Sequence, residues 1–281
     1  MPEGPEIRLA ADKVARVLVD REVEAVIFGL PRLRRFEKKL SGNTVTAVDT
    51  RGKAMLTRFD NGLTIYSHNQ LYGRWYTVRR PRMPKTTRQL RIELRTETHK
   101  ALLYSASDID VLDEEQLLTH PFLSRVGPDI LDRSLTASHI VERLCDPVFR
   151  NRSLGSLYLD QRFLAGNGNY LRSEILWAAR LDPKLKPAGL AAPALHTLAA
   201  ETLRIARRSY RTRGVTVLPE LARRLKADGL TYQAYRFYVF GREALPCHRC
   251  GTPIERHTMG SRNLFMCPTC QSLSTNKVCV G

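Results

Sequence analysis

Two hydrophobic periodicities divide the chain into three regions. Residues 5–20 repeat apolar side chains every three or four positions, which predicts an amphipathic helix, and Pro5 suits its first turn. From about 22 to 112 the pattern becomes alternating, as in residues 90–95, with turn signals between short runs. From about 131 the helical spacing returns. We therefore expect an α+β chain in which an antiparallel β-sandwich with a flanking helix precedes a helical region.

The helical region is expected to contain four helices and one glycine-rich turn. Ser134 and Thr136 are both possible N-caps of the first helix, which would run to Cys145. The other helices are predicted over residues 154–163, 170–179 and 192–208. Between the second and third lies Gly166-Asn167-Gly168-Asn169, whose glycines permit positive φ and whose helix N-terminus offers free N–H groups to a phosphate. A plain loop between helices is the alternative interpretation.

The net charge indicates the class of partner. Lys and Arg number 45 against 28 acidic residues, which gives a formal charge of +17. So basic a chain is expected to bind a polyanion, most commonly nucleic acid, although a ribosomal or generally adhesive protein would share this composition. No stretch approaches 18 apolar residues, and no apolar signal region follows the start. We expect a cytoplasmic protein.

Four of the six cysteines form two CxxC pairs separated by 16 residues. The predicted metal ligands are Cys247, Cys250, Cys267 and Cys270. Four thiolates at this spacing fit one tetrahedral Zn²⁺ with no open position, so the zinc would be structural. Redox CxxC pairs are the alternative, but they would require a βαβ context that is absent. Residues 254–266 predict a hairpin with Gly260 near its tip, presenting Arg262, whereas Cys145 is assigned to the core and Cys279 to a tail.

The first residues carry a candidate nucleophile. Removal of the initiator Met would leave Pro2 with a free secondary amine, and an α-amino group titrates near pH 8, against about 10.4 for Lys. Attack of this amine on a sugar C1′ would give an iminium that cannot lose its charge through an N–H proton. Glu3 and Glu6 are close enough in sequence to handle protons. Taken alone, this start is more simply an unstructured terminus.

Four separated motifs together resemble the formamidopyrimidine-DNA glycosylase/endonuclease VIII family. They are Met1-Pro2-Glu3-Gly4-Pro5-Glu6, Thr50-Arg51-Gly52-Lys53-Ala54, Asp160-Gln161 leading to Gly168-Asn169-Tyr170, and the Cys₄ hairpin with Arg262. The likeness runs from residue 1 to about 271. Gly4 and the segment 67–73 (SHNQLYG) resemble the endonuclease VIII branch. Two departures are Asn167, where an apolar residue is usual, and a longer tail after Cys270.

The resemblance implies a domain order. A catalytic β-sandwich domain with its N-terminal helix would cover 1–125, a helix–two-turn–helix domain 126–243, a zinc finger 244–271 and a tail 272–281. Damaged double-stranded DNA would bind in the cleft between the domains, with no cofactor beyond one zinc. The resemblance further implies a monomer in the bacterial cytoplasm, associated with the nucleoid through DNA.

The resemblance also implies a bifunctional enzyme of base excision repair that removes oxidised pyrimidines and then cleaves the strand by β,δ-elimination. By analogy with the family, Pro2 would be the Schiff-base nucleophile and Glu3 the acid that opens the deoxyribose ring. Lys53 would serve β-elimination, and Arg262 would serve δ-elimination and bind phosphate. Glu6 completes the predicted catalytic set.

The predicted DNA contacts are Gln70, Leu71, Tyr72, Arg125 and Asn169. The segment 70–72 lies between two runs of β-like alternation. Its side chains are a polar amide, a bulky apolar group and an aromatic ring, which together would fill the space left by a flipped base. The alternative is that Leu71 and Tyr72 pack into the sandwich core. Two other functions remain open: oxidised-purine specificity, and a non-catalytic DNA-damage binder, which would be expected to lose Pro2, Glu3 or Lys53.

Overall fold

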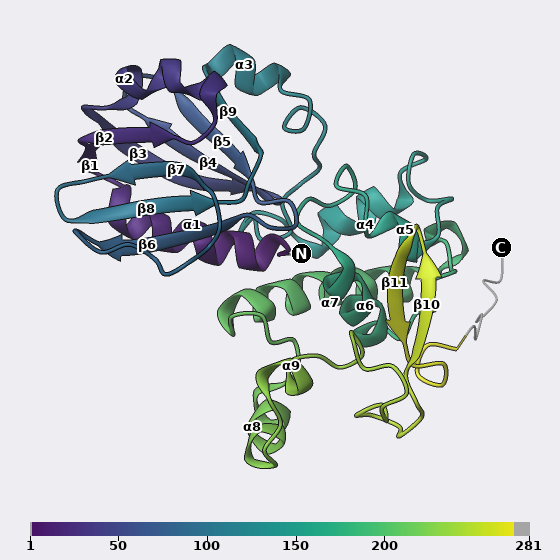
Figure 1. Ribbon diagram of the computed structural model, residues 1–281. Helices are drawn as coiled ribbons and strands as arrows, with labels where there is room; N and C mark the ends of the chain where they lie inside the picture. The colour runs from purple at the N-terminus through teal and green to yellow at the C-terminus, as the bar shows by residue number, and fades with distance from the viewer. Residues whose placement is uncertain (1, 273–281) are drawn as a thin grey trace. The chain divides into compact units, whose positions relative to one another are not determined.

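The chain folds into two compact units, Met1–Val126 and Gly127–Gly281. Figure 1 shows the computed structural model, which describes residues 2–272. Cys279 lies outside the described residues. Among the described residues, no helix is long and apolar enough to cross a membrane.

The first unit is a sandwich of two antiparallel sheets. Its strands are β1 (Arg21–Val23), β2 (Ala25–Phe28), β3 (Asn43–Arg51), β4 (Ala54–Phe59), β5 (Thr64–His68), β6 (Arg74–Arg79), β7 (Leu90–Arg95), β8 (His99–Tyr104) and β9 (Asp108–Leu112). One sheet has the order β1-β3-β4-β5-β9 and the other β2-β7-β8-β6. The sandwich predicted from the alternating pattern is therefore confirmed.

Helix α1 (Gly4–Leu18) packs along this sandwich and contacts strands of both sheets, among them β3 and β8 (Figure 1). Its apolar stripe, which includes Ile7, Val14 and Leu18, is buried, as the spacing predicted. Three short helices were not predicted: η1 (Pro31–Phe36), α2 (Glu37–Leu40) and α3 (Glu114–Thr119). None exceeds six residues, which is too short for a hydrophobic period to be recognised.

The second unit is helical and ends in a hairpin. Its elements are α4 (Ala137–Cys145), α5 (Leu154–Leu157), α6 (Asn169–Ala178), η2 (Pro187–Gly189), α7 (Ala192–Arg211), α8 (Pro219–Ala227), α9 (Tyr232–Tyr235), β10 (Glu255–Met259) and β11 (Arg262–Met266). Thr136, and not Ser134, caps α4, because its hydroxyl accepts from the His139 N–H at 3.3 Å. The predicted helix over 192–208 extends to Arg211, and α8 and α9 were not predicted.

The helix predicted over 154–163 is wrong beyond Leu157. The side chain of Gln161 explains where it stops. Its amide nitrogen donates to the carbonyls of Leu159 at 3.1 Å and Asn167 at 2.9 Å, and its oxygen accepts from Gly166 N at 3.1 Å. Such side-chain bonds offer the backbone an alternative to the helical ladder. The chain therefore turns at 158–163 and its next helix begins only at Asn169.

Two further predictions of the second unit can be checked. Cys145 is exposed and was wrongly assigned to the core, because Leu144 occupies the buried face at the end of α4 and the next residue points about 100° away. The hairpin is confirmed: β10 and β11 pair in antiparallel register around Gly260, which has φ +63°, and Ser261, which has φ +56°. Positive φ at both central residues is typical of a two-residue hairpin turn. In Figure 1 this hairpin is the yellow pair of arrows.

Candidate active site and zinc finger

The predicted nucleophile directly precedes the first helix. Pro2 is half-buried, and Glu3, the N-cap residue of α1, is 3% exposed. Glu6 Oε2 accepts a hydrogen bond from the Glu3 backbone N–H at 3.0 Å, one half of a capping box. The structure therefore fixes Glu3 beside Pro2 at the positive end of a helix dipole. It gives Glu6 a capping role, while the catalytic role of Glu6 stays a prediction.

Lys53 lies in the turn between β3 and β4, at one end of the five-stranded sheet. The next residue, Ala54, pairs with His68 at the end of β5. Burial lowers the pKa of His68, Asp108 acts in the opposite direction, and the charge of nearby Lys53 lowers this pKa further. The imidazole is therefore neutral near pH 7, and its Nδ1 accepts from the Gln70 N–H at 3.2 Å. Lys53 and the loop that begins at Gln70 thus share one end of the sheet.

The predicted wedge, residues 70–72, is an exposed loop held by its neighbours. Leu71 is 57% exposed and Tyr72 68%, so the alternative that they pack into the core is wrong. Gln70 takes φ +50°, and its Oε1 accepts from Ser107 Oγ at 2.9 Å. The guanidinium of Arg88 donates to the Tyr72 carbonyl. Arg88 and Ser107 were not found from the sequence, because their partners lie 16 and 37 residues away and no motif links them.

Arg125 is exposed in the turn that ends the first unit. Its backbone N–H donates to the Phe122 carbonyl at 3.2 Å. The ring of Phe122 packs edge-on against His68, with ring centroids 5.7 Å apart. The turn that carries Arg125 therefore abuts the same end of the sheet as Lys53 and the 70–72 loop.

Asn169 is the first residue of α6, after the glycine-rich turn. Gly166 takes φ +95° and Gly168 is the N-cap, so the predicted turn into a helix N-terminus is confirmed. Asn167, between them, is fully buried, and neither polar atom of its amide finds a partner among the described residues. An amide buried in this way costs about 1–3 kcal/mol of stability.

Arg262 is exposed at the start of β11, directly after the hairpin turn. Glu174 on α6, which was not found from the sequence, holds the segment that precedes the zinc finger. Its buried carboxylate accepts from the Thr216 hydroxyl at 2.5 Å and from three successive backbone N–H groups, those of residues 238, 239 and 240, at 2.8, 2.8 and 3.0 Å. Burial raises the pKa of Glu174, and the four donated bonds oppose that rise. This cradle fixes the segment that leads into the cysteine cluster.

The four predicted ligands form one cluster. All four sulfur atoms lie within 4.8 Å of one another. The Sγ–Sγ distance is 3.4 Å for Cys250–Cys267, 3.5 Å for Cys250–Cys270 and 4.0 Å for Cys247–Cys270. A tetrahedron with Zn–S bonds of about 2.3 Å has edges of about 3.8 Å, so these thiolates fit one Zn²⁺. Because four sulfurs complete the shell, the zinc is structural.

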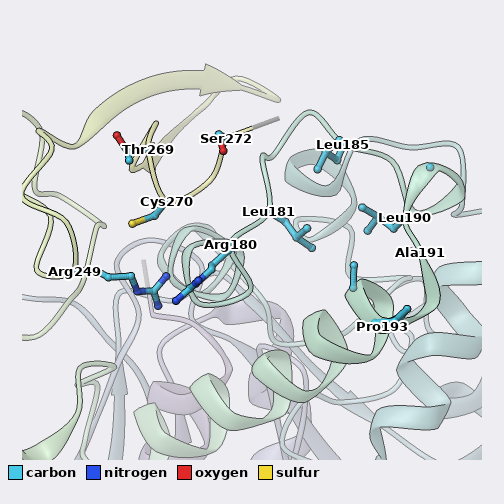
Figure 2. A pocket seen from close by; sticks show the side chains of 12 residues that line it. Arg180, Leu181, Leu185, Leu190, Ala191, Pro193, Arg249, Thr269, Cys270 and Ser272 are labelled. Atoms are coloured by element: carbon cyan, nitrogen blue, oxygen red, sulfur yellow. The ribbon is translucent and has the colours of Figure 1, made fainter. Parts of the chain in front are cut away.

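A cavity of about 590 Å³ lies beside the cysteine cluster in the second unit. Figure 2 shows its lining, in which Arg180 and Arg249 lie on one side and Leu181, Leu185 and Leu190 on the other. Cys270 is the only predicted site residue among the described residues that line it. This cavity therefore does not bring together the residues predicted for catalysis.

Three family models match the chain in order. They are the formamidopyrimidine-DNA glycosylase N-terminal domain over residues 1–107, the formamidopyrimidine-DNA glycosylase H2TH domain over 126–218, and a zinc finger found in FPG and IleRS over 244–273. Among curated relatives, Endonuclease 8 of Escherichia coli O17:K52:H18 is 50% identical over 273 residues, covering 96% of this chain and 100% of the relative. Endonuclease 8 of Shigella sonnei is 51% identical over 271 residues, with the same coverage.

Solved structures agree in fold. A complex of Lactococcus lactis Fpg (MutM) with DNA containing an oxidised pyrimidine has a TM-score of 0.79 at 19% identity, covering 96% of this chain and all of that one. MutM in complex with DNA containing carbocyclic 8-oxo-G has a TM-score of 0.77 at 20% identity, with the same coverage.

The chain therefore belongs to the formamidopyrimidine-DNA glycosylase/endonuclease VIII family. It is a DNA glycosylase/AP lyase of base excision repair with one structural zinc. The family, fold and metal predicted from the sequence are confirmed.

Proposed function

We propose that this enzyme removes oxidised pyrimidines from double-stranded DNA through a Schiff base on Pro2 and then cleaves the strand by β,δ-elimination. The observation that carries this proposal is the shared end of the five-stranded sheet, where Lys53 lies beside an exposed 70–72 loop. A cation for the reacting sugar and phosphates and an apolar wedge for the base stack are the two groups that a glycosylase/lyase needs close together.

The covalent step begins at Pro2. The lone pair of its amine attacks C1′ of the damaged nucleotide, and the base leaves with the electron pair of the glycosidic bond. The proline nitrogen gives up its N–H proton, and the leaving base takes up one proton. Glu3, held at the helix N-terminus, donates a proton to O4′ as the deoxyribose ring opens, which leaves a Pro2–C1′ iminium. Because the proline nitrogen then has no proton to lose, the iminium keeps its charge and acidifies C2′–H.

Strand cleavage follows from that iminium. Removal of a C2′ proton expels the 3′ phosphate in β-elimination, the step that we assign to Lys53. A second elimination expels the 5′ phosphate, and we assign stabilisation of this leaving phosphate to the Arg262 guanidinium, whose forked donors suit phosphate oxygens. We assign Glu6 to proton transfer beside Pro2, with its Oε2 accepting from the Glu3 N–H.

DNA binding rests on phosphate contacts and on the wedge. Asn169 and the N-terminus of α6 offer donors to the backbone, and Arg125 and Arg262 are exposed cations. Gln70, Leu71 and Tyr72 would occupy the space left by the flipped base. The partner is therefore damaged duplex DNA, bound by a monomer.

Domain limits and cellular location complete the proposal. We assign residues 1–125 to catalysis, 126–243 to the helix–two-turn–helix domain, 244–271 to the zinc finger and 272–281 to a tail. The separation of the two compact units after Val126 supports the first limit. The bacterial origin of the relatives supports a location in the bacterial cytoplasm.

One assay tests the substrate class. Duplexes carrying thymine glycol, 5-hydroxyuracil, 8-oxoguanine or an abasic site are incubated with the protein, and the cleaved products are separated by length. We expect cleavage at both pyrimidine lesions and at the abasic site, with phosphate left on both sides of the gap. Faster cleavage at 8-oxoguanine than at either pyrimidine would favour the oxidised-purine alternative, and binding without cleavage would favour a non-catalytic binder.

A further inference from the structure

Arg172, in the first turn of α6, has a fully buried side chain whose guanidinium donates hydrogen bonds to several groups. Its Nη1 donates to the carbonyls of Gly155 at 2.9 Å and Met259 at 3.2 Å. Its Nη2 donates to Asn169 Oδ1 at 2.6 Å and to the Asn263 carbonyl at 3.2 Å. One guanidinium therefore joins α5, the start of α6 and both strands of the C-terminal hairpin.

These hairpin carbonyls lie on either side of Arg262. Met259 is the last residue of β10 and pairs with Arg262 across the turn, and Asn263 directly follows Arg262 in β11. The bonds from Arg172 therefore fix the backbone from which the Arg262 side chain extends. The same Nη2 also donates to the side-chain amide of Asn169. The positions of Asn169 and Arg262, two predicted phosphate contacts about 90 residues apart, are therefore both fixed by Arg172.

The hairpin tip also fits closely against α5. A Cβ added at Gly155 would come within 2.2 Å of Met259 Sδ, so the Met259 side chain would have to shift to make room for it. A second tie lies one residue beyond Arg172, where Ser173 Oγ accepts from Phe265 N at 3.3 Å and donates to the Asn169 carbonyl at 3.1 Å. The hairpin is thus docked on the same helix turn that orients Asn169.

A purely structural role is the alternative for a buried arginine, and the same unit contains one for comparison. Arg242 is also buried, and it donates to the carbonyls of Tyr238 at 2.9 Å and Pro246 at 3.0 Å, which lie at the base of the zinc finger. Its bonds involve none of the predicted DNA contacts. Arg172 differs because its acceptors include Asn169 itself and the two residues that flank the turn and Arg262.

We propose that Arg172 is a positioning residue that sets the Asn169 amide and the Arg262 guanidinium at a fixed spacing for the DNA backbone. This inference rests on the roles proposed above for those two residues. A misplacement of about 1 Å can slow a catalysed step by about 100-fold. Loss of Arg172 is therefore expected to slow δ-elimination, which we assign to Arg262, far more than β-elimination, which we assign to Lys53 in the other unit.

The test uses the full-length zinc-bound protein and a duplex with a preformed abasic site, and it resolves β- and δ-products with time. For Arg172→Met we expect δ-elimination to slow by about 10- to 100-fold, β-elimination at saturating enzyme to change less than about threefold, and zinc content to stay at one per chain. Arg172→Lys keeps a cation and part of the bonding, so it should recover part of the δ-rate. The matched control, Arg242→Met, should leave the product ratio unchanged.

A second pair of variants decides the question if Arg172→Met does not fold. Gly155→Ala forces the Met259 side chain to move while leaving Arg172 in place, and it should raise the share of β-product. The double variant Gly155→Ala/Met259→Ala makes room again and should restore the original ratio. Failure of the double variant to restore the ratio would contradict docking of the tip as the cause.

Arg262→Ala separates this inference from the proposed function. If Arg262→Ala shifts the product ratio but folded, zinc-bound Arg172→Met does not, positioning by Arg172 is wrong and the role of Arg262 stands. If Arg172→Met slows both steps equally, its role is structural only and the inference is likewise wrong. If Arg262→Ala itself leaves the ratio unchanged, the assigned role of Arg262 fails and the positioning role falls with it.

Discussion

The two units hold their functional groups in different ways. In the first unit, Lys53, His68 and the 70–72 loop are positioned by strand register and by short-range bonds at one end of a sheet. In the second, Asn169 and Arg262 depend on buried charged side chains and on a cysteine cluster, which join segments far apart in sequence. The groups proposed for catalysis in the first unit thus lie on a fold whose core includes no residue of the cysteine cluster, whereas the groups proposed to bind DNA in the second unit are held by long-range bonds.

This difference predicts that damage to the two units will be separable. Changes in the second unit should weaken DNA binding and δ-elimination while the sandwich stays folded. Changes at the sheet end of the first unit should affect base excision while zinc stays bound.

The largest effect is expected from loss of the metal. Cys250→Ser should release zinc and abolish detectable DNA binding, because zinc binding contributes about 10–16 kcal/mol to the folding of zinc-finger peptides. The sandwich should retain its own unfolding transition, since its core includes no residue of the cysteine cluster. Metal analysis, DNA titration and calorimetry measure these outcomes, with the exposed Cys145→Ser as control. Well-folded, active protein without zinc would contradict the prediction.

A smaller and more selective effect is expected at the wedge. Leu71→Ala should slow excision of a paired lesion by about tenfold, about 1.4 kcal/mol of barrier, because less apolar surface then supports the flipped state. Cleavage at a preformed abasic site should barely change, since less stacking must be broken there. Single-turnover rates on the two duplexes give the comparison. Leu118→Ala on α3, also an exposed leucine at 78%, is the matched control. Equal losses on both duplexes would indicate a folding defect instead.

The smallest effect on activity is expected at Asn167, in the second unit. Replacing its buried, unpartnered amide by Asn167→Leu should stabilise that unit by about 1–3 kcal/mol, or about 2–4 °C in Tm for each kcal/mol. DNA affinity should stay the same, because Gly166 and Gln161 shape the turn. Thermal unfolding measures the change, with the exposed Asn151→Leu as control. A fall in Tm would mean that the larger side chain cannot be accommodated, and the amide would then not be the dominant cost.

The sequence predicts those features whose signal is local. The stripe of α1, the alternation of the strands, the cysteine spacing and the exposed 70–72 loop could all be inferred from neighbouring residues. Arg172, Glu174 and Arg88 could not, because most of their partners are backbone groups between 16 and 91 residues away, which leave no side-chain pattern. The helix predicted to Phe163 failed for a related reason, since Gln161 bonds across the turn to Gly166 and Asn167.

The central claim, that the Pro2 amine is the nucleophile, is tested most directly by borohydride trapping. Protein with its initiator Met removed is incubated with a lesion-bearing duplex and borohydride, digested, and the cross-linked peptide identified by mass spectrometry. The account predicts one adduct on the N-terminal peptide at Pro2, and none when Met1 or an uncleaved N-terminal tag blocks the amine. Efficient trapping by the blocked protein, or an adduct that maps to Lys53, would contradict it.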